Sequence, residues 1–307
     1  MIAYHRSAVY CALAIVVTQP ELPLFGFLNV NKPLGITSHD VVAKVRRASG
    51  IKKVGHAGTL DPLATGVLIL CVGTATRLSE YVMHGTKRYR ARVRLGITTS
   101  TYDAEGEILQ QRDASQIKRE AVEQALIPYR GDIQQVPPMF SAIKQGGKKL
   151  YELARAGETV GREPRSVRID SLTIIDWQPP EFTLDITCSA GTYIRSLAYD
   201  LGETLGVGAH LAGLVRTASG VFTLENATPL DTLLTDFGSH LVSPAVALAE
   251  YPVLMIEAAA EQEIAYGRAI PGALADGTIT MAYSADERLI AVLHAESGWL
   301  KPQKVFL

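Results

Sequence analysis

Residues 55–68, with the sequence GHAGTLDPLATGVL, place one acidic side chain, Asp61, in a turn-rich segment that leads into an apolar run. Glycine permits positive φ and Pro62 fixes its own φ, so the backbone around Asp61 is constrained. The residue before a proline also favours extended backbone. A carboxylate on a stiff loop beside a buried strand can serve as a nucleophile or a base. On spacing alone, a turn-closing or capping role is the more ordinary explanation.

The loop that carries Asp61 must be positioned by helices and strands, which the spacing of hydrophobic residues predicts. Helices are predicted over residues 38–48, with Ser38 as N-cap, and over 76–83, 116–129, 149–156 and 192–205. Strands are predicted over residues 25–30, 66–73, 89–95, 106–111, 167–175, 182–188 and 208–217. Strand pairs with interspersed helices favour an α+β sheet over a βαβ pattern. The sequence has no GxGxxG or Walker motif, so it indicates no nucleotide cofactor.

The formal net charge of −1 hides an asymmetry between the two ends of the chain. Residues 25–110 hold 12 Lys and Arg against 6 Asp and Glu, whereas residues 225–307 hold 4 against 11. Arginines alternate along one predicted strand and therefore share a face: Arg88, Arg90, Arg92 and Arg94. Because a structural sheet gains little from a row of like charges, this stripe favours a nucleic-acid partner over a solvated face.

Three scattered cysteines, Cys11, Cys71 and Cys188, lack CxxC spacing, which argues against a disulfide framework or a zinc site. Residues 7–18 are apolar and follow Arg6, as in the apolar region of a secretory signal. That stretch is shorter than the ~20 residues that span a membrane. We expect residues 1–24 to be poorly packed, either because the translation start lies upstream of the true one or because they form a short unneeded extension. We expect a cytoplasmic protein without membrane contact.

The string at residues 55–68 closely resembles the active-site motif of the TruB family of tRNA pseudouridine synthases. Further blocks resemble the same family: FLNVNKPLGITS at 27–38, KRYR at 87–90, TYDAEG at 101–106, VPPMFSAIK at 136–144 and GTYIRSL at 191–197. The resemblance is dense over about residues 25–225 and looser to 307. It implies an α+β fold, a pseudouridine-synthase core whose central, mainly antiparallel mixed sheet carries flanking helices.

The resemblance also implies a domain organisation. Residues 25–240 are expected to form the catalytic domain, with an RNA-gripping, thumb-like insert at about 137–166 that is rich in Lys, Arg and Gly. Residues 251–307 are expected to form a small PUA-like β module. The acidic balance of that module argues for limited contact with RNA phosphates.

Within the resemblance, Asp61 takes the place of the catalytic carboxylate and Arg195 that of its cationic partner. A carboxylate in a dry pocket needs such a partner to stay ionised. Asp103 and Lys32 are expected to support this pair. A phosphate contact or a charge in a turn would explain Lys32 equally well.

Other positions of the resemblance imply how the RNA base is held. The target uracil lies in a folded loop and must be flipped out to react. Tyr89 is expected to stack on it and to help remove the C5 proton, with Tyr193 on the opposite side and Leu214 against the base. His56 is expected to fill the gap that the flipped base leaves.

The resemblance therefore predicts a tRNA pseudouridine-55 synthase that isomerises the T-loop uridine. No atom is added or removed overall, so no cofactor and no metal are expected. The expected partner is the tRNA T-arm, bound by a monomer without a guide RNA. The residues leave open whether Asp61 attacks covalently or takes a ribose proton. Two alternatives stand beside this prediction: a synthase of other RNA specificity, such as the guide-dependent relatives, and an RNA-folding chaperone, which would not need Asp61, Tyr89 and Arg195.

Overall fold

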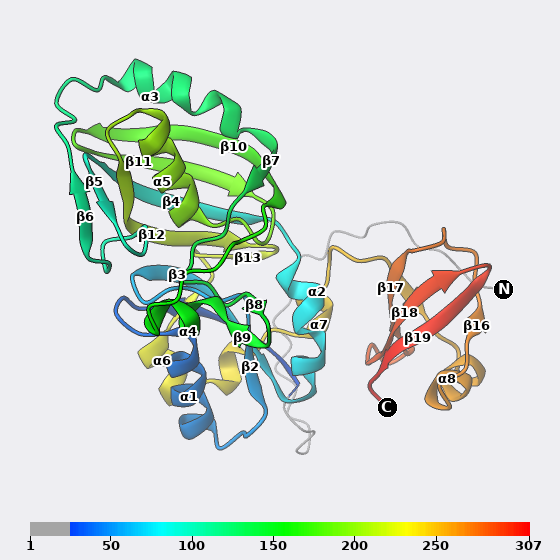
Figure 1. Ribbon diagram of the computed structural model, residues 1–307. Helices are drawn as coiled ribbons and strands as arrows, with labels where there is room; N and C mark the ends of the chain where they lie inside the picture. The colour runs from blue at the N-terminus through cyan, green and yellow to red at the C-terminus, as the bar shows by residue number, and fades with distance from the viewer. Residues whose placement is uncertain (1–24) are drawn as a thin grey trace.

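The computed structural model describes residues 25–307, so the predictions for residues 1–24, including Cys11, lie outside the described residues. Figure 1 shows a large sheet with helices against it and, at the right, a smaller sheet that contains the C-terminal strands. The strands of the large sheet are β1 (Gly26–Lys32), β2 (Val54–Ala57), β3 (Ala64–Val72), β4 (Lys87–Leu95), β7 (Gly131–Gln135), β10 (Arg165–Gln178), β11 (Glu181–Cys188), β12 (Ala209–Ser219), β13 (Phe222–Thr223) and β14 (Thr228–Pro229).

The large sheet has the strand order β14-β1-β3-β12-β4-β11-β10-β7, with β2 and β13 paired to β3 and β12. Only the pairs β1–β14 and β3–β12 are parallel, and the other pairs are antiparallel. The prediction of an α+β fold with a central, mainly antiparallel mixed sheet is therefore confirmed. A separate hairpin joins β5 (Ile97–Thr99) to β6 (Ile108–Gln111).

Among residues 25–307, five helices lie in the predicted segments with shifted ends, and three lie in segments for which no helix was predicted. They are α1 (Ser38–Ser49), α2 (Ser79–Met83), α3 (Arg119–Ala125), α4 (Leu150–Arg155), α5 (Ile194–Thr204), α6 (Leu230–Thr235), α7 (Pro244–Ala247) and α8 (Ala258–Ala265), with 3-10 turns η1 (Gly73–Leu78), η2 (Ile127–Tyr129) and η3 (Gly238–His240). The predicted helix over 116–129 divides into α3 and η2, since Pro128 cannot donate to a continuing α-helical ladder.

Helix α1 has its N-cap one residue before the predicted one. The Thr37 side chain accepts a hydrogen bond from Asp40 N at 3.1 Å, and the Asp40 carboxylate accepts one from Thr37 N at 2.8 Å. This capping box satisfies two free N–H groups at the helix start. The prediction of Ser38 as N-cap was wrong because its hydroxyl bonds to the loop that carries Asp61.

Strands β1 and β3 are buried on both faces. Leu28 and Leu68 pack in a core with α1, whereas Phe27 and Ile69 pack in a second core that includes Val292 of the small C-terminal sheet. A strand buried on both sides reads as a continuous apolar run, which explains the sequence of residues 67–72.

Strand β4 alternates buried and exposed residues along its whole length, so the predicted arginine face is confirmed. Acidic residues of the neighbouring β11 pair with it: Arg88 with Asp185 at 3.1 Å, and both Arg92 and Arg94 with Glu181 at 3.3 and 3.6 Å. The premise of uncompensated like charges was therefore wrong for three of the four arginines. The alternation also places the stripe on the face opposite to Tyr89. The stripe is thus explained by cross-strand ion pairs.

Residues 137–166 contain the short hairpin β8 (Lys144–Gln145) and β9 (Lys148–Lys149), followed by α4. The helix predicted at 149–156 is therefore present. Leu150 and Leu153 are buried, so this insert is seated on the protein by its helix. Its hairpin keeps Lys144 and Lys148 exposed.

The C-terminal sheet has the order β15-β17-β18-β19-β16. Its strands are β15 (Val253–Met255), β16 (Ile270–Pro271), β17 (Ile279–Tyr283), β18 (Leu289–Glu296) and β19 (Trp299–Val305). It contacts the helical turn after β3: Arg77 donates to Val305 O at 2.6 Å and Lys304 pairs with Glu80 at 3.1 Å. A small C-terminal β module was predicted and is confirmed. Among residues 25–307 no helix has the length and apolarity needed to cross a membrane.

Candidate active site

Asp61 lies on the loop between β2 and β3, and hydrogen bonds hold this loop on both sides of the carboxylate. The Ser38 hydroxyl accepts from Leu60 N at 2.8 Å and donates to Leu60 O at 3.0 Å. Gly35 N donates to Pro62 O at 2.9 Å, and Ala64 N donates to Asp61 O at 3.0 Å. The start of α1 and the turn after β1 therefore fix the backbone that carries Asp61.

Lys32 is fully buried at the end of β1. Its ammonium donates to Pro33 O at 2.9 Å and to Ala64 O at 2.7 Å. Burial lowers the pKa of Lys32 to about 8, and the charge of Asp61 opposes that fall. These contacts favour the turn charge over the phosphate contact, since the ammonium is turned to backbone carbonyls beside the Asp61 loop.

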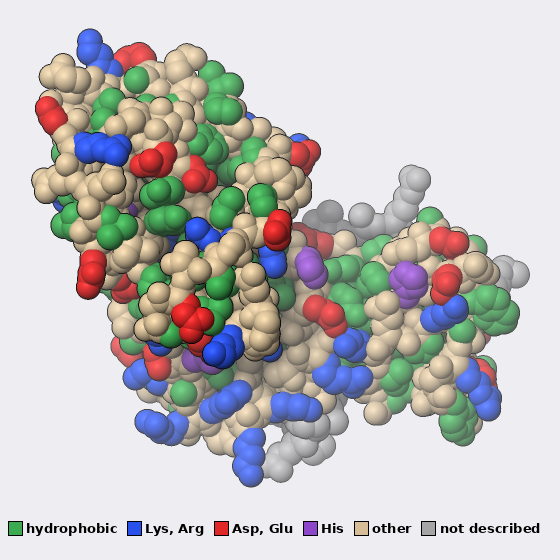
Figure 2. Space-filling view, in the orientation of Figure 1, with side chains coloured by type: hydrophobic (Ala, Val, Ile, Leu, Met, Phe, Trp, Pro, Cys, Tyr) green, Lys and Arg blue, Asp and Glu red, His purple; other side chains and the backbone are tan. Residues whose placement is uncertain are grey.

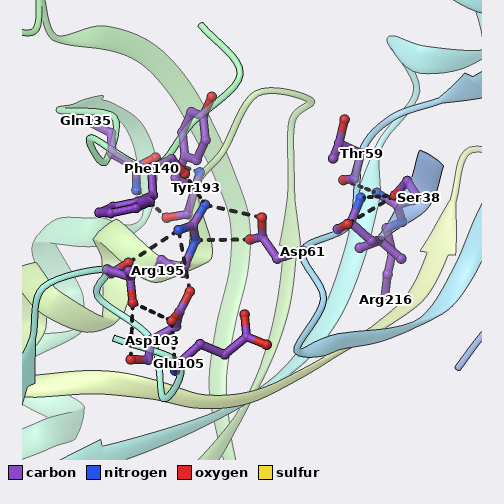
Figure 3. Close-up of polar contacts among 12 residues, drawn as sticks. Ser38, Thr59, Asp61, Asp103, Glu105, Gln135, Phe140, Tyr193, Arg195 and Arg216 are labelled. Atoms are coloured by element: carbon purple, nitrogen blue, oxygen red, sulfur yellow. Dashed lines mark hydrogen bonds and ion pairs between the residues drawn. The ribbon is translucent and has the colours of Figure 1, made fainter. Parts of the chain in front are cut away.

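Arg195 lies in the first turn of α5 and pairs with Asp61 through two contacts, Nε to Oδ2 at 3.0 Å and Nη2 to Oδ1 at 3.3 Å. Figure 3 shows the guanidinium facing the carboxylate. The Arg195 side chain is 6% exposed and that of Asp61 is 35% exposed. The guanidinium of Arg195 is therefore enclosed by protein, whereas part of the Asp61 carboxylate stays accessible from solvent.

The other donors of Arg195 are also occupied. They reach Phe140 O at 2.7 Å, Thr101 O at 3.3 Å and Asp103 Oδ2 at 3.4 Å. Asp103 is buried and accepts from the Thr101 hydroxyl at 2.5 Å. Asp103 thus contacts Arg195 and holds its guanidinium in the plane that meets Asp61, as a supporting residue would.

The charge state of Asp61 depends on these neighbours. Burial raises the pKa of Asp61, Arg195 lowers it, Asp103 raises it and Lys32 lowers it. The two cations therefore counteract the burial that would otherwise neutralise the carboxylate.

Tyrosine and leucine side chains form the apolar side of the site. Tyr89 on β4 and Leu214 on β12 are each 8% exposed and belong to one core cluster with Leu60. Tyr193 precedes α5, and its N–H and C=O both bond to the Gln135 side chain, at 2.7 and 3.0 Å. Its ring lies beside Arg195 and Asp61 in Figure 3. The structure thus gathers aromatic surface next to the carboxylate.

His56 lies on β2 and contacts the edge of His39, with 5.1 Å between ring centroids. Burial, with smaller contributions from His39 and Arg216, lowers the pKa of His56 to about 4. The ring is therefore neutral at pH 7. Its buried Nδ1 has no hydrogen-bond partner within residues 25–307.

Ser38, Gln135 and Arg216 also hold the site, although sequence reasoning gave them no such part. Arg216 had a visible signal, since it is the one charged residue within the strand segment LVRTAS. Ser38 and Gln135 had none, because their partners Leu60 and Tyr193 lie far along the chain. Within the described 25–307 region, no group of three His, Cys, Asp or Glu side chains could hold a metal ion.

Comparison with protein families gives two adjoining matches. Residues 46–194 match the TruB family pseudouridylate synthase N-terminal domain, and residues 195–241 match the tRNA pseudouridylate synthase B C-terminal domain. Two relatives carry the name tRNA pseudouridine synthase B. One, from Symbiobacterium thermophilum, is 51% identical over 79% of this chain and 82% of its own length. Another, from Burkholderia pseudomallei, is 44% identical over 92% of this chain and 97% of its own length.

Solved structures share the fold. A Cbf5–Nop10–Gar1 complex contains a chain with a TM-score of 0.73 and 26% identity, covering 92% of this chain and 85% of that one. An H/ACA RNP bound to a substrate RNA containing 2′-deoxyuridine contains one with a TM-score of 0.72 and 22% identity, covering 93% of this chain and 86% of that one. The loop carboxylate, the family matches and the identities over most of both chains lead to one conclusion: the chain belongs to the TruB family of pseudouridylate synthases.

Proposed function

We propose that the chain isomerises the uridine at position 55 of the tRNA T-loop to pseudouridine, as a stand-alone cytoplasmic monomer without a guide RNA or cofactor. The observation that carries the proposal is the Asp61 carboxylate, held on a fixed loop by the enclosed Arg195 and open on one side. The names of the relatives, which match over most of both chains, support tRNA as the substrate.

The reaction rearranges bonds at one nucleotide. The C1′–N1 bond breaks, the uracil turns and the C1′–C5 bond forms, after which C5 loses a proton and N1 gains one. Asp61 starts this sequence by attacking C1′ or by taking a ribose proton. Both routes require an ionised carboxylate, and Arg195 and Lys32 favour that form.

The uracil must leave the RNA stack to reach Asp61. Tyr89 and Tyr193 offer ring faces for it, and Leu214 offers an apolar contact in the same core. The neutral ring of His56 is suited to occupy the place of the flipped base in the RNA loop.

Exposed cations on α1 and the turn after it supply a positive field for the RNA. Figure 2 shows blue side chains gathered along the lower edge of the molecule, over the region of α1 and β2 in Figure 1. The exposed cations of this region are Lys44, Arg46, Arg47, Lys52 and Lys53. Together with the exposed lysines of the 137–166 insert, they account for phosphate binding better than the β4 stripe does.

Removal of the Asp61 charge tests the catalytic role. Asp61→Asn preserves the size of the side chain, so we expect unmodified tRNA to bind as before while pseudouridine formation is lost. Asp113→Asn, which changes an exposed carboxylate far along the chain, is the matched control and should keep full turnover. Turnover by the Asp61→Asn variant would remove Asp61 from the mechanism.

The guide-dependent alternative rests on the RNP complexes among the structural neighbours. Turnover on tRNA alone, measured with purified protein, separates the two. Activity that appears only after an RNA guide is added would favour the alternative. Tight binding of tRNA without any modification would favour a chaperone.

A further inference from the structure

Arg216 on β12 is a buried cation without an acidic partner. It is 2% exposed, and the buried ion pairs of the site belong to Arg195; none among residues 25–307 involves Arg216. Burying an uncompensated charge is costly, and replacing it with an apolar residue would ordinarily improve stability. This cost points to a task for the guanidinium beyond packing.

The position of Arg216 in the sheet connects both halves of the site. β12 lies between β3 and β4, and Arg216 is directly opposite Gly66 on one side and Tyr89 on the other. Residues directly opposite each other in a sheet share a face, so the Arg216 side chain lies beside the Tyr89 ring. Gly66 has φ +94°, and a Cβ there would come within 2.3 Å of Arg216 O. The glycine of the motif therefore permits this close approach.

The guanidinium holds the segment that leads to Asp61. Its Nε donates to Val67 O at 2.7 Å, Nη2 to Gly58 O at 3.2 Å and Nη1 to Thr59 O at 3.5 Å. Figure 3 shows Arg216 against Thr59, on the other side of the Asp61 loop from Arg195. A forked, planar donor can bridge three carbonyls at once, which a lysine ammonium on a flexible stem does less well.

The same guanidinium acts on the Tyr89 hydroxyl. Burial raises the pKa of Tyr89, and the positive charge of Arg216, on the neighbouring strand, opposes that rise. Cys188 on β11 and Asp61 on the loop also act on Tyr89, and both raise its pKa. The charge of Arg216 also lowers the pKa of three other groups: Lys32 on β1, His56 on β2 and Lys87 on β4. Arg216 is thus the group that favours an acidic, polarised hydroxyl at this position.

We propose that Arg216 is a positioning residue with two tasks: it fixes the loop that presents Asp61, and it orients and polarises the Tyr89 hydroxyl towards the flipped uracil. The inference rests on the proposed function, because it assumes the assigned roles of Asp61 and Tyr89. Loop fixation needs the fork of donors, whereas polarisation of Tyr89 needs only a positive charge. The two tasks can therefore be separated by substitution.

Two variants, Arg216→Lys and Arg216→Met, separate these tasks in single-turnover pseudouridine formation measured against pH. Arg216→Met removes both the loop fixation and the positive charge near Tyr89. We therefore expect its rate to be about 10²-fold lower, as for a misplaced catalytic group. We also expect its pH–rate profile to shift to higher pH. Arg216→Lys keeps the charge, so its rate should fall while its pH profile stays that of the wild type. RNA affinity should stay unchanged in both.

Arg130→Met is the matched control, since Arg130 donates twice to Leu172 O, at 2.8 and 3.3 Å, in a part-buried place away from the site. The inference would be overturned if both Arg216 variants lost no more rate than Arg130→Met and kept the wild-type pH profile. If Arg216→Met does not fold, Arg216→Lys and Tyr89→Phe are combined; their effects on the rate should be non-additive, and additive effects would overturn the coupling. Wild-type protein inactive on tRNA would instead count against the proposed function.

Discussion

Replacement of Arg195 by Met should leave the carboxylates of Asp61 and Asp103 without their shared cationic partner. The change removes both contacts to Asp61 and the contact to Asp103 while it keeps a side chain of similar length. Breaking a buried pair from one side costs about 3–5 kcal/mol. Asp61 is 35% exposed and so contributes less than a fully enclosed partner, which places the expected loss of stability near the lower end of that range.

The loss should depend on pH in a defined direction. Burial already raises the pKa of Asp61, and the variant lacks the cation that opposes this rise. A carboxyl group whose pKa is higher in the folded protein than in the unfolded chain destabilises the fold as pH rises through that range. The Arg195→Met protein should therefore be nearest to the wild type in stability under acidic conditions, and its destabilisation should be complete above the folded-state pKa of Asp61.

The pH dependence of the rate provides the assay. Because turnover requires ionised Asp61, the acidic limb of the single-turnover profile of Arg195→Met should lie at higher pH than that of the wild type. Arg119→Met is the control, since Arg119 forms an exposed pair with Glu123 at 2.8 Å and should change stability by about 0.5 kcal/mol or less. A variant profile that runs parallel to the wild-type profile at all pH values would refute the assignment of Arg195 as the group that keeps Asp61 ionised.

Three further substitutions test other parts of the site. Ser38→Ala leaves the backbone N–H and C=O of Leu60 without their partner, so thermal unfolding should show a loss of about 1–3 kcal/mol; unchanged stability would show that the loop is held elsewhere. Gly66→Ala should be strongly destabilising, because the Cβ would overlap Arg216 O at a positive φ; a normal melting temperature would contradict this. Alanine at both Lys148 and Lys149 should weaken tRNA binding and flatten its dependence on salt, and an unchanged salt slope would place the RNA away from the insert.

The sequence predicted well those strands and helices in which each position is either buried or exposed in a regular local pattern. The alternation from Lys87 to Leu95 identified β4 and its exposed arginines because period-two burial is a local property. The neutralisation of those arginines was not predictable, since Glu181 and Asp185 become neighbours only through strand pairing across about 90 residues. Local charge counts therefore suggested a nucleic-acid stripe where the sheet forms ion pairs.

The site shows the same division. Resemblance placed Asp61 and Arg195 together, and the structure brings them into contact from 134 residues apart. It did not indicate Arg216, because the carbonyls that this residue holds belong to a loop about 150 residues earlier. The role of Ser38 was misread for a related reason: a serine at a helix start has a local use as N-cap, and the tertiary contact with Leu60 took precedence.

The most direct test of the central claim is a map of pseudouridine along an unmodified tRNA transcript after incubation with the purified protein, without guide RNA or cofactor. We expect one modified nucleotide, the T-loop uridine at position 55, and none with the Asp61→Asn protein. Pseudouridine at another position, or at none, would contradict the proposed substrate.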